Sequence, residues 1–176
     1  WFILFPFTYK EILSKKKEIS NYLPLLLFLG LTSVGLFNSF VYVSLQYTQV
    51  INASLFNTAI PAAIILSCFI FKIEKTNFYQ LLGLLISVLG ILVIITKFNL
   101  NILLNLDFNI GDIWMIGAVI CWGLYSSFLK KLKLKISLLS FVHIVCTCGL
   151  IFLLPQFSYE YFQGNAATID QTFLYC

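Results

Sequence analysis

The sequence predicts an all-α integral membrane protein, a multi-pass helical bundle. Of its 176 residues 60% are hydrophobic and only 10% are charged, and the mean hydropathy is +0.96. A soluble domain would carry roughly a quarter of its residues as charged side chains. The lysines lie in clusters at the ends of apolar runs and form no continuous patch. We therefore expect the lipid bilayer as a partner and no nucleic acid.

Five apolar stretches are long enough, or nearly so, to cross a bilayer core of about 30 Å, which takes roughly 20 helical residues. They are residues 23–45, 53–71, 78–96, 113–129 and 136–154. The connections between most of them are short, so consecutive helices should be antiparallel neighbours. Residues 1–7 resemble the end of an earlier span and residues 172–176 the start of a later one. We therefore interpret the chain as a fragment of a longer protein.

The lysine clusters predict the orientation of these spans. All but one of the eleven lysines fall at 10–17, 72–75 and 130–135. Loops on the cytoplasmic side of membrane proteins collect Lys and Arg. With their three glutamates the clusters carry a formal charge of +7, against −3 for the intervening loops, which together give the net charge of +4. Segments 8–22, 72–77 and 130–135 are thus assigned to the cytoplasmic face of the cell membrane, and 156–171 to the outside.

Enzymatic groups are missing from the sequence pattern. There is no Gly-rich phosphate loop, no Ser/His/Asp grouping and no pair of carboxylates within the apolar spans. The five cysteines are odd in number and match no disulfide or zinc spacing, so they are expected to be packing residues. His143, the single histidine, is expected to hydrogen-bond a neighbouring helix, with a proton relay as the alternative. We predict no catalytic residue, no metal and no cofactor.

The span 23–45 has one polar face. Thr32, Gly35, Asn38, Tyr42 and Gln46 recur every three or four positions, which places them on one side of a helix. We expect this side to face protein or a cavity instead of lipid. Asn38 and Tyr42 are its candidate substrate-binding residues.

A proline interrupts the next span. Pro61 lies four residues after Asn57 and cannot donate the hydrogen bond that the Asn57 carbonyl would otherwise accept. Transporters build binding sites from such interrupted helices, because irregular backbone within the membrane is tolerated only where it faces protein or a wet cavity. Asn57 is therefore a candidate binding residue and Pro61 a helix kink. The alternative is a simple kink in which Asn57 bonds to a neighbouring helix.

The span 113–129 carries aromatic and hydroxyl groups on one face. Trp122, Tyr125 and Ser126 follow helical spacing. At about 1.5 Å per residue, Trp122 lies within roughly 10 Å of the membrane midplane, as do Asn38 and Asn57. A shared cavity with Trp122 and Tyr125 on its wall is the functional interpretation, and an aromatic packing stripe is the alternative.

The order of these features resembles the EamA repeats of the drug/metabolite transporter superfamily. The stretch 47–61 is followed by Glu74-Lys75, as in that family, although Ile73 replaces the usual glycine. The second repeat typically opens with Gly-Asp, a Cys-Trp helix, an aromatic residue and a basic loop. Similar residues here are Gly111-Asp112, Cys121-Trp122, Tyr125 and Lys130-Lys131.

The resemblance implies ten helices in two inverted five-helix repeats around a central substrate cavity. Residues 1–97 would hold the tail of helix 2 and helices 3 to 5 of the first repeat. Residues 98–112 would be an external linker, and 113–176 would hold helices 6, 7 and the start of helix 8.

We therefore predict a secondary transporter that moves a small organic metabolite, amino-acid-like or related, across the cytoplasmic membrane by alternating access. Its partners would be that solute, the bilayer and a coupling ion. The predicted lining residues are Asn38, Tyr42, Asn57, Trp122 and Tyr125, with Pro61 shaping the helix. The alternative is a membrane-embedded structural or assembly subunit whose polar stripes only join helices. A third interpretation, a membrane enzyme that uses His143, would need a partner group from elsewhere in the complete protein.

Overall fold

The computed structural model describes residues 4–74, 77–96 and 109–162, and within these ranges it contains helices and no strand. The predicted all-α class is confirmed. Most of the predicted linker 98–112 and the segment 172–176 lie outside the described residues. The elements, in chain order, are α1 (Phe5–Ser14), α2 (Lys16–Asn21), α3 (Leu23–Gly30), the π-helix η1 (Leu31–Phe37), α4 (Asn38–Leu45), α5 (Val50–Asn57), α6 (Ile60–Ile70), α7 (Phe78–Thr96), α9 (Ile110–Leu129) and α10 (Leu138–Phe162).

Within the described residues, four helical stretches are long and apolar enough to cross a membrane: Leu23–Leu45, Ala53–Ile70, Ile110–Leu129 and Leu138–Tyr159. They correspond to four of the five predicted spans. A segment buried in lipid is helical because a helix satisfies its own backbone hydrogen bonds. The fifth predicted span forms a helix, α7, over the predicted range. The described apolar part of this helix, Phe78–Gly90, is shorter than the 18 residues required of a membrane span.

The start of α9 differs from the expected one. The helix begins at Ile110, because Asn109 caps it by accepting a hydrogen bond from the Gly111 N–H. Asp112 in turn accepts a 3.2 Å hydrogen bond from the Asn109 backbone N–H. The two residues form a reciprocal capping box, which satisfies donors that a helix start leaves open.

Two expected loops are helical. Segment 8–22 was expected to be a cytoplasmic loop, yet it folds into α1 and α2, which meet at Lys15 and join α3 at Tyr22. Lysine and glutamate are good helix formers, so charge alone does not break a helix. Likewise α10 runs through Pro155 to Phe162, so residues 156–162 are helical and do not begin an irregular external segment.

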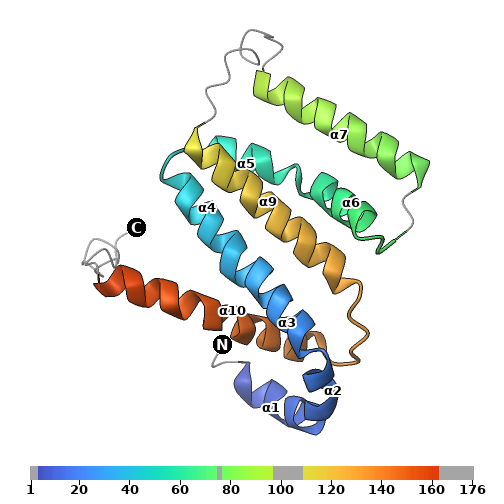
Figure 1. Ribbon diagram of the computed structural model, residues 1–176, viewed down its shortest axis with the longest axis vertical. Coiled ribbons are helices and arrows are strands. Elements are labelled where there is room, and N and C mark those ends of the chain that lie inside the picture. Colours follow the sequence, from blue (N-terminus) through green and yellow to red (C-terminus); the bar gives the residue numbers. More distant parts are fainter. Residues whose placement is uncertain (1–3, 75–76, 97–108, 163–176) are drawn as a thin grey trace.

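The helix α9 occupies the centre of the molecule (Figure 1). It packs against α3, η1 and α4 on one side and against α5 and α6 on the other. α7 lies at the edge and packs on α6, whereas α10 packs on α3 and η1. Many of the functional groups described below lie on α9 or on helices that pack against it.

Small residues bring the helices together closely. A Cβ added to Gly123 of α9 would lie 2.8 Å from the Ala63 Cβ of α6, and one added to Gly30 of α3 would lie 2.6 Å from the Cys148 Cβ of α10. Small residues at helix interfaces allow such approach in membranes, where dispersion contacts replace the hydrophobic effect as the main attraction. Tight backbone packing therefore fixes α9 on α6, and α10 on α3.

Polar contacts mark the two ends of the bundle. At one end Lys130, after α9, forms a 2.5 Å ion pair with Glu74, after α6, and this hydrogen bond raises the pKa of Lys130. At the other end Asn109 donates a hydrogen bond to the Tyr47 carbonyl, and Thr48 donates one to Asp112 over 3.4 Å. The first end brings together loops that the lysine pattern assigns to the same side of the membrane.

Candidate functional site

The first span is irregular in its middle. Residues Leu31–Phe37 form a π-helix, a rare conformation that is frequent at functional sites. Thr32 and Ser33 are buried, and their hydroxyls donate to carbonyls of the preceding turn, Thr32 to Phe28 over 2.9 Å and Ser33 to Leu29 over 2.6 Å. Such back-bonding competes with the regular helical pattern and bends helices. The polar face predicted for this span thus includes residues whose backbone is π-helical instead of α-helical.

Asn38 lies where the π-helix returns to α-helix. Its side-chain amide donates to the carbonyls of Val34 and Ser33, over 3.0 and 3.2 Å. Backbone carbonyls within a membrane need partners, because lipid supplies none. The amide of this predicted binding residue therefore stabilises the irregular backbone.

The second span is interrupted next to Asn57. This residue ends α5, Thr58 and Ala59 form a turn, and α6 begins at Ile60 with Pro61 in its first turn. The turn is held by hydrogen bonds of shorter range, from Thr58 N–H to the Leu55 carbonyl at 3.1 Å and from Ala59 N–H to the Phe56 carbonyl at 2.9 Å. Asn57 and Pro61 are both exposed.

An aromatic cluster joins η1 to α9. The Trp122 ring lies 4.6 Å from the Phe37 ring and 5.3 Å from the Tyr125 ring, measured between centroids. Both distances fall within the range of favourable tilted aromatic pairs. Trp122 and Tyr125 are half-buried, and Phe37 directly precedes Asn38. The structure thus brings two of the predicted residues, Trp122 and Tyr125, together at the contact of η1 with α9.

A groove of about 380 Å³ opens on an adjoining face of the same helices. Residues of η1 and α4 form one wall of the groove. Trp114 of α9 and Phe152 of α10 form the rest of its lining together with Gln156. The lining residues are Leu31, Gly35, Leu36, Ser39, Phe40, Val43, Trp114, Phe152 and Gln156. None of these side chains is charged, so the groove is an apolar and aromatic surface with a few uncharged polar groups. That composition is typical of small-molecule sites.

The polar groups of the groove are paired. The Ser39 hydroxyl, on α4, is 2.8 Å from the side-chain carbonyl oxygen of Gln156, on α10, and 2.9 Å from the Gly35 carbonyl. The Phe40 and Trp114 rings lie beside this pair, with centroids 5.1 Å apart. An amide and a hydroxyl offer donors and acceptors together, so this part of the groove can bond a solute that carries both.

None of the five predicted binding residues lines this groove. Asn38 and Tyr42 occupy the neighbouring face of α4, where Tyr42 is 68% exposed, and Asn57 lies exposed at the end of α5. Sequence reasoning missed Ser39, Trp114 and Gln156. Gly35, Ser39 and Val43 do follow a helical spacing, which was available as a signal, whereas Gln156 was expected in an external segment.

His143 forms the expected hydrogen bond between helices. Its Nδ1 atom is 2.7 Å from the hydroxyl of Thr8 on α1, and both residues are buried. The Phe5 ring lies 6.1 Å from the imidazole. Within the described part of the chain, no group of three or more His, Cys, Asp or Glu side chains could hold a metal ion.

Comparison with known proteins agrees with this architecture. The profile of the EamA-like transporter family matches residues 1–96 and 109–173. The chain is 29% identical over 112 residues to the uncharacterized transporter YyaM of Bacillus subtilis, covering 63% of this chain and 36% of that protein. It is also 29% identical over 133 residues to an uncharacterized transporter of Haemophilus influenzae, covering 73% of this chain and 43% of that protein. No solved structure matches it.

The chain therefore spans less than half the length of these two relatives. The family matches cover most of its residues, and the described part of the chain has four helices long and apolar enough to cross a membrane. This chain is a multi-pass protein of the cell membrane and belongs to the EamA-like transporter family.

Proposed function

We propose that the protein containing this chain is a secondary transporter that moves a small organic metabolite across the cell membrane by alternating access. The observation that carries the proposal is the uncharged groove beside the π-helix, where Ser39 and Gln156 lie next to the Phe40 and Trp114 rings. Irregular backbone at membrane depth is tolerated where it is buried in protein or lines a cavity. The π-helix and the break after Asn57 are two such irregularities.

The chemistry of the groove favours an amino-acid-like or related solute. Its aromatic walls suit an apolar or planar part of the molecule, because ring contacts add to simple burial. The Gln156 amide and the Ser39 hydroxyl suit a polar part with both donors and acceptors. A coupling ion gradient is the proposed source of energy.

The five residues predicted from sequence are proposed to line the path on the neighbouring face. Trp122 and Tyr125 would stack on the solute, and Asn38, Tyr42 and Asn57 would offer polar groups as it passes. Pro61 would keep α6 separate from α5. The two matched stretches support a division into a first repeat, residues 1–97, and a second repeat from residue 113, joined by the linker 98–112.

Transport assays on the complete protein test the proposal. The protein is reconstituted in proteoliposomes, and labelled metabolites are screened for saturable flux with and without an imposed ion gradient. For a transported solute, Ser39→Ala and Trp114→Ala should each raise KM about threefold to tenfold, as expected for the loss of one hydrogen bond or stacking contact.

Ser54→Ala is the matched control. Ser54 lies exposed on α5 and, like Ser39, donates to a carbonyl of the preceding turn, at 2.8 Å. Equal effects of Ser39→Ala and Ser54→Ala would show that the groove is not the binding site. Absence of flux over the whole panel, with a partner protein copurifying in fixed ratio, would favour an assembly subunit instead.

A further inference from the structure

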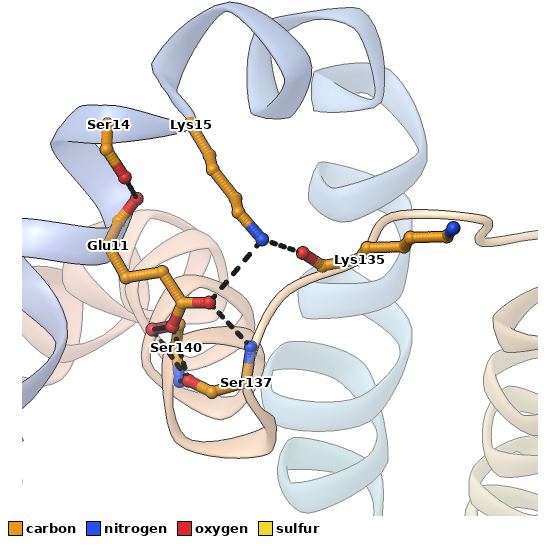
Figure 2. Close-up of polar contacts among 6 residues, drawn as sticks. All are labelled: Glu11, Ser14, Lys15, Lys135, Ser137 and Ser140. Carbon is orange, nitrogen blue, oxygen red and sulfur yellow. Dashed lines mark hydrogen bonds and ion pairs between the residues drawn. The ribbon is translucent and has the colours of Figure 1, made fainter.

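The short helix α1 is fixed to the start of α10 by a carboxylate. Glu11 accepts three hydrogen bonds there: from the Ser137 N–H at 2.9 Å, from the Ser137 hydroxyl at 2.5 Å and from the Ser140 hydroxyl at 2.6 Å (Figure 2). Ser137 precedes the first residue of α10, and its Oγ accepts a hydrogen bond from the Ser140 N–H at 3.2 Å. The carboxylate thus completes a helix cap from a residue 126 positions away.

The position suits a negative charge. In an ordinary capping box a Glu three residues after the cap accepts from the backbone N–H of the cap residue. Here Ser140 occupies that place, and Glu11 supplies the acceptor from another helix. The N-terminus of a long helix also carries a partial positive charge. The hydrogen bonds from Ser137 and Ser140 lower the pKa of Glu11 from 4.5 to about 2, so the group is ionised at physiological pH.

Three further contacts extend this row of polar contacts. Lys15 forms an ion pair with Glu11 at 3.7 Å, and it donates a hydrogen bond to the Lys135 carbonyl in the loop before α10 (Figure 2). One turn before Glu11 on α1, Thr8 contacts His143, which lies one turn after Ser140 on α10. The contacts therefore run along α1 and α10 in antiparallel register.

The attachment of α1 differs from the packing of its neighbours. The backbone leaves helical geometry at Lys15 and again at Tyr22, so two bends separate α1 from α3. The Glu11 side chain is 28% exposed and that of Lys15 35%, so water can replace their contacts. By contrast, α3 meets α10 through Gly30, where an added Cβ would clash with Cys148. Release of α1 would expose the buried pair of Thr8 and His143 and would leave the contact between Gly30 and Cys148 in place.

We propose that α1 is a latch, in which Glu11 holds this helix against the start of α10 and its release opens the lysine-rich end of the bundle. Glu11 belongs to the first stretch matched by the family and Ser137 to the second, so the latch joins the two parts that would move relative to each other. The proposal rests on the alternating-access transport proposed above, because only a moving protein needs a contact that opens.

Distance measurements on the complete protein test the latch without requiring a known substrate. Native cysteines are replaced, and spin labels are attached at Leu13→Cys on α1 and Leu139→Cys on α10, both about half exposed. In lipid vesicles the parent should show a main, short distance. Glu11→Gln should lower the ratio of docked to undocked protein about threefold to tenfold, because a neutral amide accepts hydrogen bonds more weakly than a carboxylate.

Glu18→Gln on the exposed face of α2 removes the same charge and should leave the distances unchanged. A distribution that is equally unchanged for Glu11→Gln would overturn the latch. If that variant fails to insert, the pair Ser137→Ala and Ser140→Ala removes the hydroxyl donors instead and should produce the same shift. An unshifted distribution in that pair would also overturn the proposal.

A cross-link separates failure of the latch from failure of the proposed function. Joining the two introduced thiols, at positions 13 and 139 of the double variant, with a bifunctional reagent should stop flux. Each single-cysteine variant should continue to transport after the same treatment. Full flux in the cross-linked protein would reject the latch and leave transport established. A distance shift in Glu11→Gln without flux in any form would support release of α1 and reject transport.

Discussion

Gly123 of α9 lies directly on Ala63 of α6, so that a Cβ added to the glycine would come within 2.8 Å of the alanine Cβ and 2.9 Å of its carbonyl carbon. Since the second obstacle is backbone, it cannot rotate away, and the two helices would have to separate. This contact joins the central helix to the interrupted span, so its tightness bears on the whole bundle.

We expect Gly123→Ala to destabilise the protein by about 1–3 kcal/mol, the usual cost of overpacking a tight interface. Unfolding of the purified complete protein in mixed micelles measures the change. Gly83→Ala on α7 is the control, because in the described structure an added Cβ there meets nothing within 4 Å. Equal stability of the two variants would mean that α6 and α9 are not in close contact.

Ser127→Ala should cost less, about 0.6 kcal/mol, the average for a hydrogen bond between membrane helices. The Ser127 hydroxyl is fully buried, lies 2.8 Å from the Gly123 carbonyl and 3.1 Å from the Ile64 carbonyl, and accepts from the Cys68 thiol at 3.4 Å. Alanine fits the space and removes only the hydrogen bonds. The same unfolding assay would contradict this if Ser127→Ala proved more harmful than Gly123→Ala.

The orientation predicted from the lysines can be measured by labelling. In a cysteine-free background, Lys133→Cys should react with a membrane-impermeant thiol reagent only when the cytoplasmic side is accessible, because cytoplasmic loops collect lysine. Tyr47→Cys, at the opposite end of the bundle and 51% exposed, should react in intact cells. Labelling of both positions from the same side would contradict the bundle topology, and the reverse pattern would invert the orientation.

Docking of α1 should be insensitive to pH over the physiological range. The pKa of Glu11 is lowered from 4.5 to about 2, so its contribution is fully present above pH 4.5 and is lost as the pH falls through about 2. The spin-label distance between positions 13 and 139 should stay constant from pH 8 to pH 5 and lengthen below pH 4. Glu11→Gln should show no such acid-dependent lengthening. A transition near neutral pH in the parent protein would show that another group controls docking.

Sequence patterns predicted the span 23–45 to its ends, because transfer into lipid depends on the summed hydrophobicity of a continuous segment. They did not predict the π-helix inside it, which depends on where Thr32 and Ser33 direct their hydroxyls. Segment 8–22 was assigned to the cytoplasmic face by its lysines, and that pattern did not indicate that the segment is helical. Charge reports the surroundings of a segment more directly than its backbone conformation.

The candidate site divides in the same way. Trp122 and Tyr125 are one helical turn apart, so their contact follows from local spacing. The contact between Ser39 and Gln156 joins residues 117 positions apart, and it depends on how α10 packs beside α4. Such tertiary contacts leave no periodic trace in a single sequence, which explains why the groove was missed.

Because α9 is central, we expect amino-acid substitutions to be tolerated less well along α9 than along α7. Five helical elements pack against α9, whereas within the described residues α7 packs mainly on α6 and a Cβ added to Gly83 or Gly90 meets nothing within 4 Å. Random substitutions collected under selection for function should therefore be sparse along α9 and frequent along α7. The rate at which these two helices diverge among relatives should differ accordingly, although both consist mainly of apolar residues.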